Sequence, residues 1–350
     1  MSGKTFPVCV SPTLKQQVLA IIARANRQSP SKGSQDFPGP LPKSLGRLQL
    51  SEVSTHDYWV CEKSDGERYL LFVSTHAAYF IDRKWNFYTI SSGPTSLLST
   101  CFATNGDTLL DGEWIQTREL KTPVFMLFDG VCIDGAIFAN EPTSKRLRVL
   151  TEKVIAPFRV RRESTRDVSL PFDVRVKEME TKQNVANVLN QLHDEGDSDD
   201  GDRRIRVYRS KARRISNVND GLVFTREDDD YFQGKGGLFK MKWSHTVDFL
   251  CRPEGSKVKL FAGGPNDTFI CVGALADCSE SEMRLLNTCA STTAPIIECM
   301  YSAQLGRWVL LVPRLDKSKP NYISVLTSTL QHIIDNITEK DVLQLANVQI

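Results

Sequence analysis

The sequence is organised as short apolar runs separated by turn-forming residues. Between residues 57 and 135 these runs are YWVC, RYLLFVST, AAYFID, NFYTI, TLLDGEWI and VFMLFDGVCI. Short runs rich in valine, isoleucine and aromatic residues, bounded by glycine, aspartate or asparagine, predict β-strands joined by tight turns. The segment therefore predicts an antiparallel β-meander.

Other segments have the spacing or the composition of helices and loops. Apolar residues at helical spacing predict helices over residues 12–25, 145–157 and 178–192. Residues 26–46 are rich in proline, glycine and serine and predict an extended connector. The acidic run 194–202 has almost nothing to bury and predicts a disordered loop, for which a regulatory role stays open. The basic stretch RRIRVYRSKARR follows it and fits either a solvated helix face or a phosphate-binding edge.

The composition changes after His245 to the strand runs VDFLC, KVKLFAG, TFICVGAL, IIECMYS and RWVLLVP, with one helical pattern around residues 280–287. Five short strands with an interposed helix predict a small Greek-key barrel of the OB type. The segment 324–350 predicts an amphipathic helical tail. The expected fold class is α+β, with an antiparallel-sheet domain over residues 1–245 and an OB-fold domain over 246–323.

The bulk composition excludes several classes of protein. A chain of 350 residues is long enough for two cores, and a net charge of +2 gives no overall basic field to attract nucleic acid. Nine cysteines form no CxxC pair and five histidines show no HxH or HExxH spacing. We therefore expect reduced core thiols and no metal held by soft ligands. Without a long apolar stretch or a signal core, we expect no membrane partner and a location in the cytosol or nucleus.

Charged residues stand within apolar strands in six stretches. The first, CEKSDGERYLLF, places Lys63 beside an Asp-Gly turn and Arg68 five residues later. Alone it also fits an ordinary solvated hairpin end. The others are LLDGE (109–113), FMLFDG (125–130), DGLVF (220–224), FKMKW (239–243) and RLDK (314–317).

Six such stretches predict one shared ligand, because buried charge is costly unless it is paired or ligand-bound. Lysines and arginines neutralise phosphates, whereas carboxylates hold ribose hydroxyls and metal ions. The ligand type that suits this mixture is a nucleoside triphosphate with a divalent cation. No Walker loop, GxxxxGK[ST], occurs in the sequence. Lysines on strands would then bind the phosphates, and one of them could act as a nucleophile.

These stretches resemble the motifs of eukaryotic-type mRNA guanylyltransferases, the GTP:RNA capping enzymes of the covalent nucleotidyltransferase superfamily. EKSDGERYLL resembles the signature KxDGxR, and LLDGEW, FMLFDG, NDGLVFT, FKMKWSHTVDF and RWVLLVPRLDKSKPN follow in the family's order. The resemblance spans residues 58 to about 345. TVDF and the final PN are closer to capping enzymes than to ligases. The resemblance implies that the antiparallel domain is a nucleotidyltransferase domain.

The resemblance also implies a nucleophile and a reaction. Lys63 would attack the α-phosphate of GTP, which would give a lysyl-GMP phosphoramidate and pyrophosphate. Because a lysine is protonated at neutral pH, surrounding cations would have to favour its uncharged form. The cations that the motifs offer are Arg68, Lys240 and Lys242.

Further roles follow from the same resemblance. Arg68 and Glu113 would hold the ribose hydroxyls, and Phe128 and Val223 would sandwich the guanine, which Lys177 would read. Lys240 and Lys242 would contact the α-phosphate, and Asp220 would hold a divalent cation, Mg²⁺ or Mn²⁺. The barrel residues that would orient the pyrophosphate when this domain closes are Arg314, Asp316 and Lys317.

Two positions depart from the family pattern. The longer pattern has an arginine two residues before Arg314, where this chain has Val312. Arg307 or Lys319 would be the candidates to compensate. Trp243 stands where the family usually has proline, which puts the local backbone in question more than the chemistry.

The acceptor implied by the resemblance is a 5′-diphosphate RNA, guided either by residues 203–214 or by Lys257 and Lys259, unless these are solvated charges. No HCxxGxxR phosphatase loop or glycine-rich methyltransferase stretch occurs, so we expect the RNA triphosphatase and cap methyltransferase in other chains. The family also implies the nucleus and binding to the phosphorylated tail of RNA polymerase II. Two alternatives stay open: an ATP-dependent polynucleotide ligase and a non-catalytic scaffold that binds nucleotide or RNA.

Overall fold

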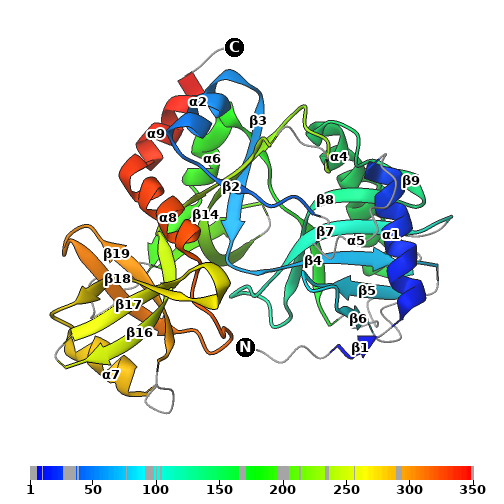
Figure 1. Ribbon diagram of the computed structural model, residues 1–350. Coiled ribbons are helices and arrows are strands. Elements are labelled where there is room, and N and C mark those ends of the chain that lie inside the picture. The colour runs from blue at the N-terminus through cyan, green and yellow to red at the C-terminus, as the bar shows by residue number, and fades with distance from the viewer. Residues whose placement is uncertain are drawn as a thin grey trace.

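The structure is a computed structural model in which the described residues form three β-sheets with helices packed on them (Figure 1). No helix in this part of the chain has the length and apolar character needed to cross a membrane. The described residues are 6–9, 11–26, 37, 39–75, 77–90, 98–99, 101–102, 105–164, 171–195, 205–212, 214–232, 236–255, 257–288 and 294–347.

The first sheet contains the long apolar strands. Its order is β1 (Val8–Cys9), β6 (Phe87–Thr89), β5 (Ala78–Ile81), β4 (Glu67–Val73), β7 (Thr108–Ile115), β8 (Val124–Ile133) and β10 (Asp173–Val176), with β9 (Ala136–Ile137) paired to β8. Neighbouring strands are antiparallel, except that β10 runs parallel to β8.

Helices cover both faces of this sheet. α1 (Pro12–Asn26) packs with Leu70 and Phe72, whereas α4 (Thr143–Leu150), a π-helical turn (Thr151–Ile155) and α5 (Ala156–Ser164) pack with Leu71. Successive side chains of a strand point to opposite faces. Burial on both faces therefore explains why RYLLFV is a continuous apolar run without alternation.

The second sheet lies beside the first (Figure 1). Its order is β11 (Glu180–Thr181), β3 (Tyr58–Ser64), β14 (Ile215–Arg226), β13 (Ile205–Ser210) and β12 (Leu192–Glu195). β15 (Leu238–Lys242) pairs with β14 and with the short β2 (Lys43–Ser44). The helices that share its hydrophobic core are α2 (Arg47–Thr55), α6 (Val185–Leu189) and α9 (Glu339–Leu343), followed by a 3₁₀ turn (Gln344–Asn347).

The third sheet has the strand order of an OB barrel. The antiparallel order is β18 (Phe269–Leu275), β17 (Lys257–Gly263), β16 (Thr246–Glu254), β19 (Ile296–Ser302) and β20 (Arg307–Pro313). α7 (Glu280–Thr288) lies between β18 and β19, and α8 (Ile323–Asp335) packs on the sheet through Ile323 and Leu326. The predicted α+β class with antiparallel sheets and an OB-type barrel is confirmed. The domain limits 1–245, 246–323 and 324–350 stay a prediction.

The predicted meander is wrong at its first strand. β3 and β4 belong to different sheets, so the turn at Asp65-Gly66 carries the chain from one sheet to the other and does not close a hairpin. β7 then returns to pair with β4. Apolar runs predict strands, but the partner of each strand depends on which buried faces match in the folded chain.

Two other predictions need correction. Of the helix expected over residues 178–192, only α6 and a 3₁₀ turn (Lys182–Asn184) are helical, and strands flank them. The basic stretch after residue 202 forms β13, so its interpretation as a helix face is wrong. β2 lies inside the expected connector 26–46, and α2 follows that connector without having been predicted. Residues 27–36, 38 and 196–202 lie outside the described residues.

The helices over residues 12–25, 145–157 and 280–287 are confirmed with small changes in their limits. The tail is helical as expected but divides into α8 and α9. α8 packs on the barrel, whereas Val342 of α9 packs in the core of the second sheet.

Candidate active site

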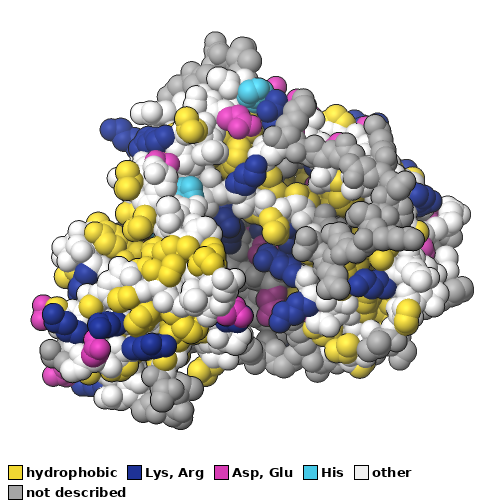
Figure 2. All heavy atoms as spheres, viewed as in Figure 1, with side chains coloured by type: hydrophobic (Ala, Val, Ile, Leu, Met, Phe, Trp, Pro, Cys, Tyr) yellow, Lys and Arg dark blue, Asp and Glu magenta, His cyan; other side chains and the backbone are white. Residues whose placement is uncertain are grey.

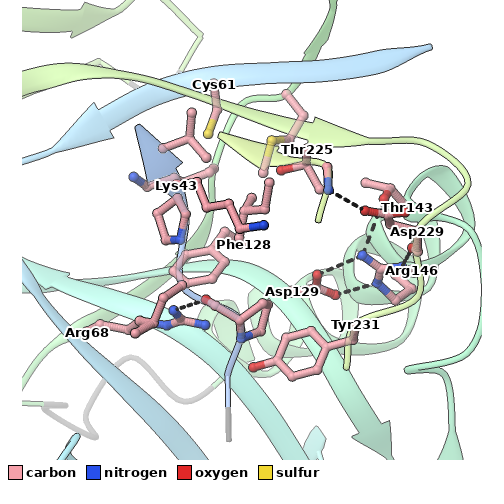
Figure 3. Close-up of a pocket in the computed structure, with 18 of the residues that line it drawn as sticks. Lys43, Cys61, Arg68, Phe128, Asp129, Thr143, Arg146, Thr225, Asp229 and Tyr231 are labelled. Carbon is pink, nitrogen blue, oxygen red and sulfur yellow. Dashed lines mark hydrogen bonds and ion pairs between the residues drawn. The ribbon is translucent and has the colours of Figure 1, made fainter. Parts of the chain in front are cut away.

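A cavity of about 230 Å³ lies between the first and second sheets (Figure 3). Its walls come from β3, β14 and β15 on one side and from β4, β7 and β8 on the other. The site therefore forms only where the two sheets meet. The predicted site residues that line it are Lys63, Arg68, Glu113, Phe128, Lys177 and Val223.

Three lysines gather around one carboxylate near this cavity. Lys63 Nζ lies 2.5 Å from Asp220 Oδ2, and Lys242 Nζ lies 3.1 Å from the same oxygen. The strand register produces this meeting, because Gly221 of β14 lies opposite Lys63 on β3 and opposite Lys242 on β15. Burial and the charges of Lys242 and Lys63 lower the pKa of Lys240, although Asp220 opposes this shift. The result is a compact cationic cluster whose counter-ion, among the described residues, is Asp220.

Asp220 reaches the lysines because it stands in a β-bulge. The register of β14 against β3 shifts between Asn219 and Gly221, and such a bulge redirects a side chain. Gly221 has φ +150°, and a Cβ there would lie only 1.8 Å from the Met241 carbonyl oxygen, so the position requires glycine. The Asn219 side-chain amide donates to the Lys63 and Gly221 carbonyl oxygens, each at 3.0 Å.

Asn219 and Gly221 were not predicted as site residues, although both belong to the quoted motif NDGLVFT. The departure at Trp243 is also explained here. Its indole N–H donates to Asn219 Oδ1, and the Arg206 guanidinium lies 4.5 Å from the centre of its ring. Trp243 therefore helps to hold the bulge from the end of β15.

The positive charge of Arg68 is balanced by the buried carboxylate of Asp111. Its Nε donates to Asp111 Oδ1 at 3.0 Å and its Nη1 to the Pro40 carbonyl at 2.6 Å, while the Tyr231 hydroxyl also donates to Asp111. Burial would lower the pKa of Arg68, but Asp111 outweighs it and the pKa is raised. The guanidinium carbon lies 5.3 Å from the centre of the Phe128 ring. Arg68 is thus fixed at the wall formed by Phe128.

This geometry changes the expected surroundings of the Lys63 amine. Its closest charged partner is the Asp220 carboxylate, and Arg68 is bound to Asp111. The amine must therefore leave an ion pair before it can act as a nucleophile. Asp111 lies within the quoted motif LLDGEW, but nothing in the sequence identified it as the partner of Arg68.

Lys177 is held between two glutamates. It follows β10, and its backbone N–H donates to the Leu127 carbonyl of β8 at 2.7 Å. Its Nζ lies 3.0 Å from Glu113 Oε2 and 3.5 Å from Glu62 Oε1. Burial alone would lower the pKa of Lys177, but the two carboxylates outweigh burial and raise it. Glu62, which was not predicted, precedes Lys63 and points to the opposite side of β3.

A second buried pair closes the other end of the cavity (Figure 3). Arg146 donates from Nε to Asp129 Oδ1 at 2.8 Å and from Nη2 to Asp129 Oδ2 at 3.0 Å. Arg146 comes from α4, and Asp129 is part of the quoted motif FMLFDG. Thr143 and Tyr231 lie beside this pair. Nothing in the sequence predicted that α4 contributes a side chain to this wall of the cavity.

Asp220 is the carboxylate predicted to hold a divalent cation, although other carboxylates, those of Glu113, Asp129, Asp229 and Asp230, line the cavity. Among the described residues there is no group of three or more histidine, cysteine, aspartate or glutamate side chains that could hold a metal alone. Magnesium is commonly bound through one or two carboxylates together with substrate phosphates and water. Asp220 beside the lysine cluster fits that mode of binding.

The predicted residues of the barrel do not line this cavity. Arg314 Nη1 lies 3.1 Å from both carboxylate oxygens of Asp248, and Lys317 pairs with the same carboxylate. Asp248 is on β16 and only 5% exposed. Hydrogen bonds from Arg314 hold the pKa of Asp316 at about 2. Arg314, Asp316 and Lys317 thus form a separate ion-pair cluster with Asp248, which we call the barrel cluster.

Neither suggested substitute for the missing arginine joins the barrel cluster. Arg307 binds the buried Glu282 at 3.0 Å and lies at the opposite end of β20 from Arg314. Lys319 pairs with the exposed Asp267 at 2.6 Å. The proposal that Arg307 compensates for Val312 is therefore not supported by its position.

Two sheets that enclose a lysine-rich cavity, followed by an OB-type barrel, define a nucleotidyltransferase. Residues 3–201 match the family model for the mRNA capping enzyme catalytic domain, and residues 244–343 match the model for its C-terminal domain. The chain belongs to the mRNA capping enzyme family and is an mRNA guanylyltransferase.

Individual relatives agree with this assignment. The chain is 27% identical to the mRNA-capping enzyme subunit alpha of Schizosaccharomyces pombe, over 88% of this chain and 79% of that protein. It is 25% identical to the protein of the same name from Saccharomyces cerevisiae, over 97% and 83% of the two chains. The solved Chlorella virus DNA ligase–adenylate is 12% identical with a TM-score of 0.37, over 80% of this chain and all of that one, a likeness too low to carry weight. The ligase alternative is not favoured.

Proposed function

We propose that this guanylyltransferase works through a covalent lysyl-GMP on Lys63, with GTP as donor and the 5′-diphosphate end of RNA as acceptor. The observation that carries the proposal is the position of Lys63. Its amine lies at the cavity between the sheets, beside Lys242 and Asp220. A nucleophilic lysine needs such a setting to meet a phosphate.

In the first step, the Lys63 ammonium group leaves Asp220 and loses one proton to water, the neutral amine attacks the α-phosphorus of GTP, and a second N–H proton passes to water. A P–N bond forms, the bond between the α-phosphorus and the bridging oxygen breaks, and pyrophosphate departs. Lys240 and Lys242 would stabilise negative charge on the α-phosphate in this step. Asp220 would hold the divalent cation, which when bound would neutralise phosphate charge.

The remaining walls would position the nucleoside. Phe128 and Val223 come from opposite sheets and would enclose the guanine, which Lys177 would read. Arg68 and Glu113 would hold the ribose hydroxyls. Because buried partners fix Arg68 and Lys177, this half of the site would bind GTP with little reorganisation.

The barrel cluster would act on the β- and γ-phosphates. Arg314 and Lys317 are paired with Asp248, so closure of the barrel would exchange this carboxylate for the phosphates of GTP. Asp316 would keep Arg314 in position. This exchange would orient the pyrophosphate for in-line departure.

In the second step, a β-phosphate oxygen of the RNA attacks the α-phosphorus, the P–N bond breaks, and the Lys63 nitrogen takes up two protons from water. A triphosphatase must first remove the γ-phosphate of the transcript. The name subunit alpha of the fungal relatives supports a partner subunit, and we propose that this partner carries the triphosphatase activity. The proposal also includes a cap methyltransferase in another chain and binding to the phosphorylated tail of RNA polymerase II. The proposed location is the nucleus.

Incubation with α-labelled GTP or ATP and Mg²⁺ or Mn²⁺, followed by denaturing electrophoresis, tests the proposal. We expect label on the protein from GTP only, and its transfer to 5′-diphosphate RNA on addition of acceptor. Label from ATP alone would indicate a ligase. Binding of GTP without any label would indicate a scaffold.

A further inference from the structure

The outer face of the barrel sheet exposes aromatic side chains beside cations. Phe269 at the start of β18 is 43% exposed, and Phe261 on β17 is partly exposed. Figure 2 shows hydrophobic side chains gathered over this part of the barrel, with lysine and arginine side chains next to them. The register places Phe269 opposite Gly263 and Phe261 opposite Cys271, so both rings lie on the same face of neighbouring strands.

An arginine lies over both rings. The Arg252 guanidinium carbon is 4.8 Å from the centre of the Phe261 ring and 5.9 Å from that of Phe269. Arg252 is exposed and forms no ion pair with any residue that the structure describes. Lys259 lies opposite Arg252 in the neighbouring strand, and Lys257 is exposed at the start of that strand. We call the set Arg252, Lys257, Lys259, Phe261 and Phe269 the barrel platform.

The chemistry of the barrel platform matches single-stranded nucleic acid. Bases stack on exposed aromatic rings and on arginine planes, while lysines follow the phosphate backbone. The platform contains three cations, and the nearby carboxylate of Glu254 pairs with Lys259. An apolar peptide would need neither the unpaired arginine nor the lysines. The face formed by strands 2 and 3 of an OB barrel, here β17 and β18, is also where such barrels bind oligonucleotides.

We propose that the barrel platform binds the single-stranded RNA that follows the 5′-diphosphate end, with one or two bases stacked on Phe261 and Phe269. The inference rests on the proposed function, because it assumes RNA as the acceptor. The platform holds the body of the transcript while its 5′ end enters the cavity between the sheets. Acceptors long enough to reach it are bound more tightly than very short ones.

The test uses the full chain with Phe269→Ala, Arg252→Gln and the double variant. Binding of a fluorescent 5′-diphosphate RNA of about 15 nucleotides is measured by anisotropy against salt concentration. We expect Phe269→Ala to weaken binding about tenfold, within the range for loss of one base–aromatic stack. Arg252→Gln weakens binding less and lowers the salt slope by about 0.7.

Two control variants lie on the barrel away from the platform and match these changes. Leu305→Ala removes an apolar side chain that is 54% exposed, and Arg284→Gln removes an arginine whose side chain is 79% exposed. Neither alters RNA binding. Lysyl-GMP formation, which needs no RNA, stays unchanged in all five variants.

Transfer of GMP to acceptors of different length separates the inference from the proposed function. In Phe269→Ala the KM for the long acceptor rises about tenfold, and in Arg252→Gln it rises less, while the KM for a dinucleotide acceptor is unchanged in both. If the variants bind the long RNA as the unaltered chain does, the platform is not an RNA site, and a protein partner becomes its occupant. Loss of lysyl-GMP formation in the unaltered chain would instead overturn the proposed function.

Discussion

The cavity between the two sheets and the barrel cluster contain the two halves of one predicted site, and they differ in how they are held. In the cavity, Arg68 and Lys177 are fixed by buried carboxylates from neighbouring strands. On the barrel, Arg314 and Lys317 share Asp248 and stay partly exposed. The half proposed to bind the nucleoside is preformed by strand register, whereas the half proposed to bind the triphosphate would have to exchange partners. The following predictions test this difference.

The largest effect is expected for the nucleophile. Lys63→Ala removes the amine that we propose forms the covalent bond, so we expect labelling with α-labelled GTP to fall at least about a thousandfold. Unfolding by urea changes little, because Lys63 is partly exposed and Asp220 keeps Lys242 as a partner. Lys43→Ala is the matched control, since Lys43 also lines the cavity, and it retains most of the labelling. Labelling that survives Lys63→Ala would place the nucleophile elsewhere.

The next largest effect tests whether register fixes the cavity half. In Gly221→Ala the new Cβ collides with the Met241 carbonyl, so β14 must separate from β15. We expect a loss of about 3 kcal/mol in the free energy of unfolding and a roughly hundredfold loss of labelling, as Asp220 and the lysines move. Gly273→Ala on β18 is the control, because an added Cβ there meets nothing within 4 Å. Unchanged labelling in the Gly221 variant would show that the bulge does not position the cluster.

A smaller effect is expected on the barrel. It distinguishes the residue that pairs with Arg314 and Lys317 from the residues proposed to act in catalysis. Asp248→Asn removes the charge that binds Arg314 and Lys317, and we expect a loss of about 2 kcal/mol in the free energy of unfolding. Labelling at saturating GTP stays within about tenfold, whereas Arg314→Ala reduces labelling more with less loss of stability. Urea titrations and initial labelling rates measure the two effects. An Asp248 variant as inactive as Lys63→Ala would mean that this carboxylate belongs to the catalytic machinery.

The smallest effect concerns the joint between the two regions. His245, just before β16, stacks on His332 of α8 with ring centres 6.1 Å apart. Burial, His332 and Lys242 lower the pKa of His245, and burial with Lys240 lowers that of His332 despite Asp335. Both pKa values lie below the ordinary 6.5. Below pH 6.5 the unfolded chain therefore binds more protons than the folded chain.

Stability is therefore fully present above pH 6.5 and falls as the pH decreases below it, by at most about 1.4 kcal/mol per pH unit for each histidine. Urea unfolding between pH 5 and 8 measures this slope. His245→Gln and His332→Gln each flatten the curve, and His56→Gln, far from this joint in the sequence, serves as the control. An unchanged slope in both variants would contradict the assignment.

The sequence predicted most of the elements but not their partners. The apolar runs of β4, β7 and β8 and the pattern of α1 were sufficient, because local periodicity reports burial. The same periodicity did not reveal that β3 and β4 lie in different sheets. It also overestimated the helix around α6, where strand pairing on both sides prevailed over helical spacing.

For the site, the motifs predicted Lys63, Glu113 and Asp220 as site residues, but they did not predict the charged groups that pair with them. Glu62 and Asp111 lie inside quoted motifs, yet a motif does not state which charges pair. Tyr231 and Arg146 lie in no motif. The barrel residues Arg314, Asp316 and Lys317 stay a prediction from the family resemblance, and their pairing with Asp248 depends on the register of β16 and the loop after β20.

By itself, the sequence determined which residues carry charge into apolar strands, where strands and helices form, and to which family the chain belongs. Only the tertiary structure decided that Asp220 pairs with two lysines and that buried carboxylates balance the charges of Arg68 and Lys177. It also decided that Arg314 pairs with Asp248. The physical reason is that a charge in a folded chain is governed by the nearest opposite charge and by its exposure to water, and both depend on distances between strands that are far apart in the sequence.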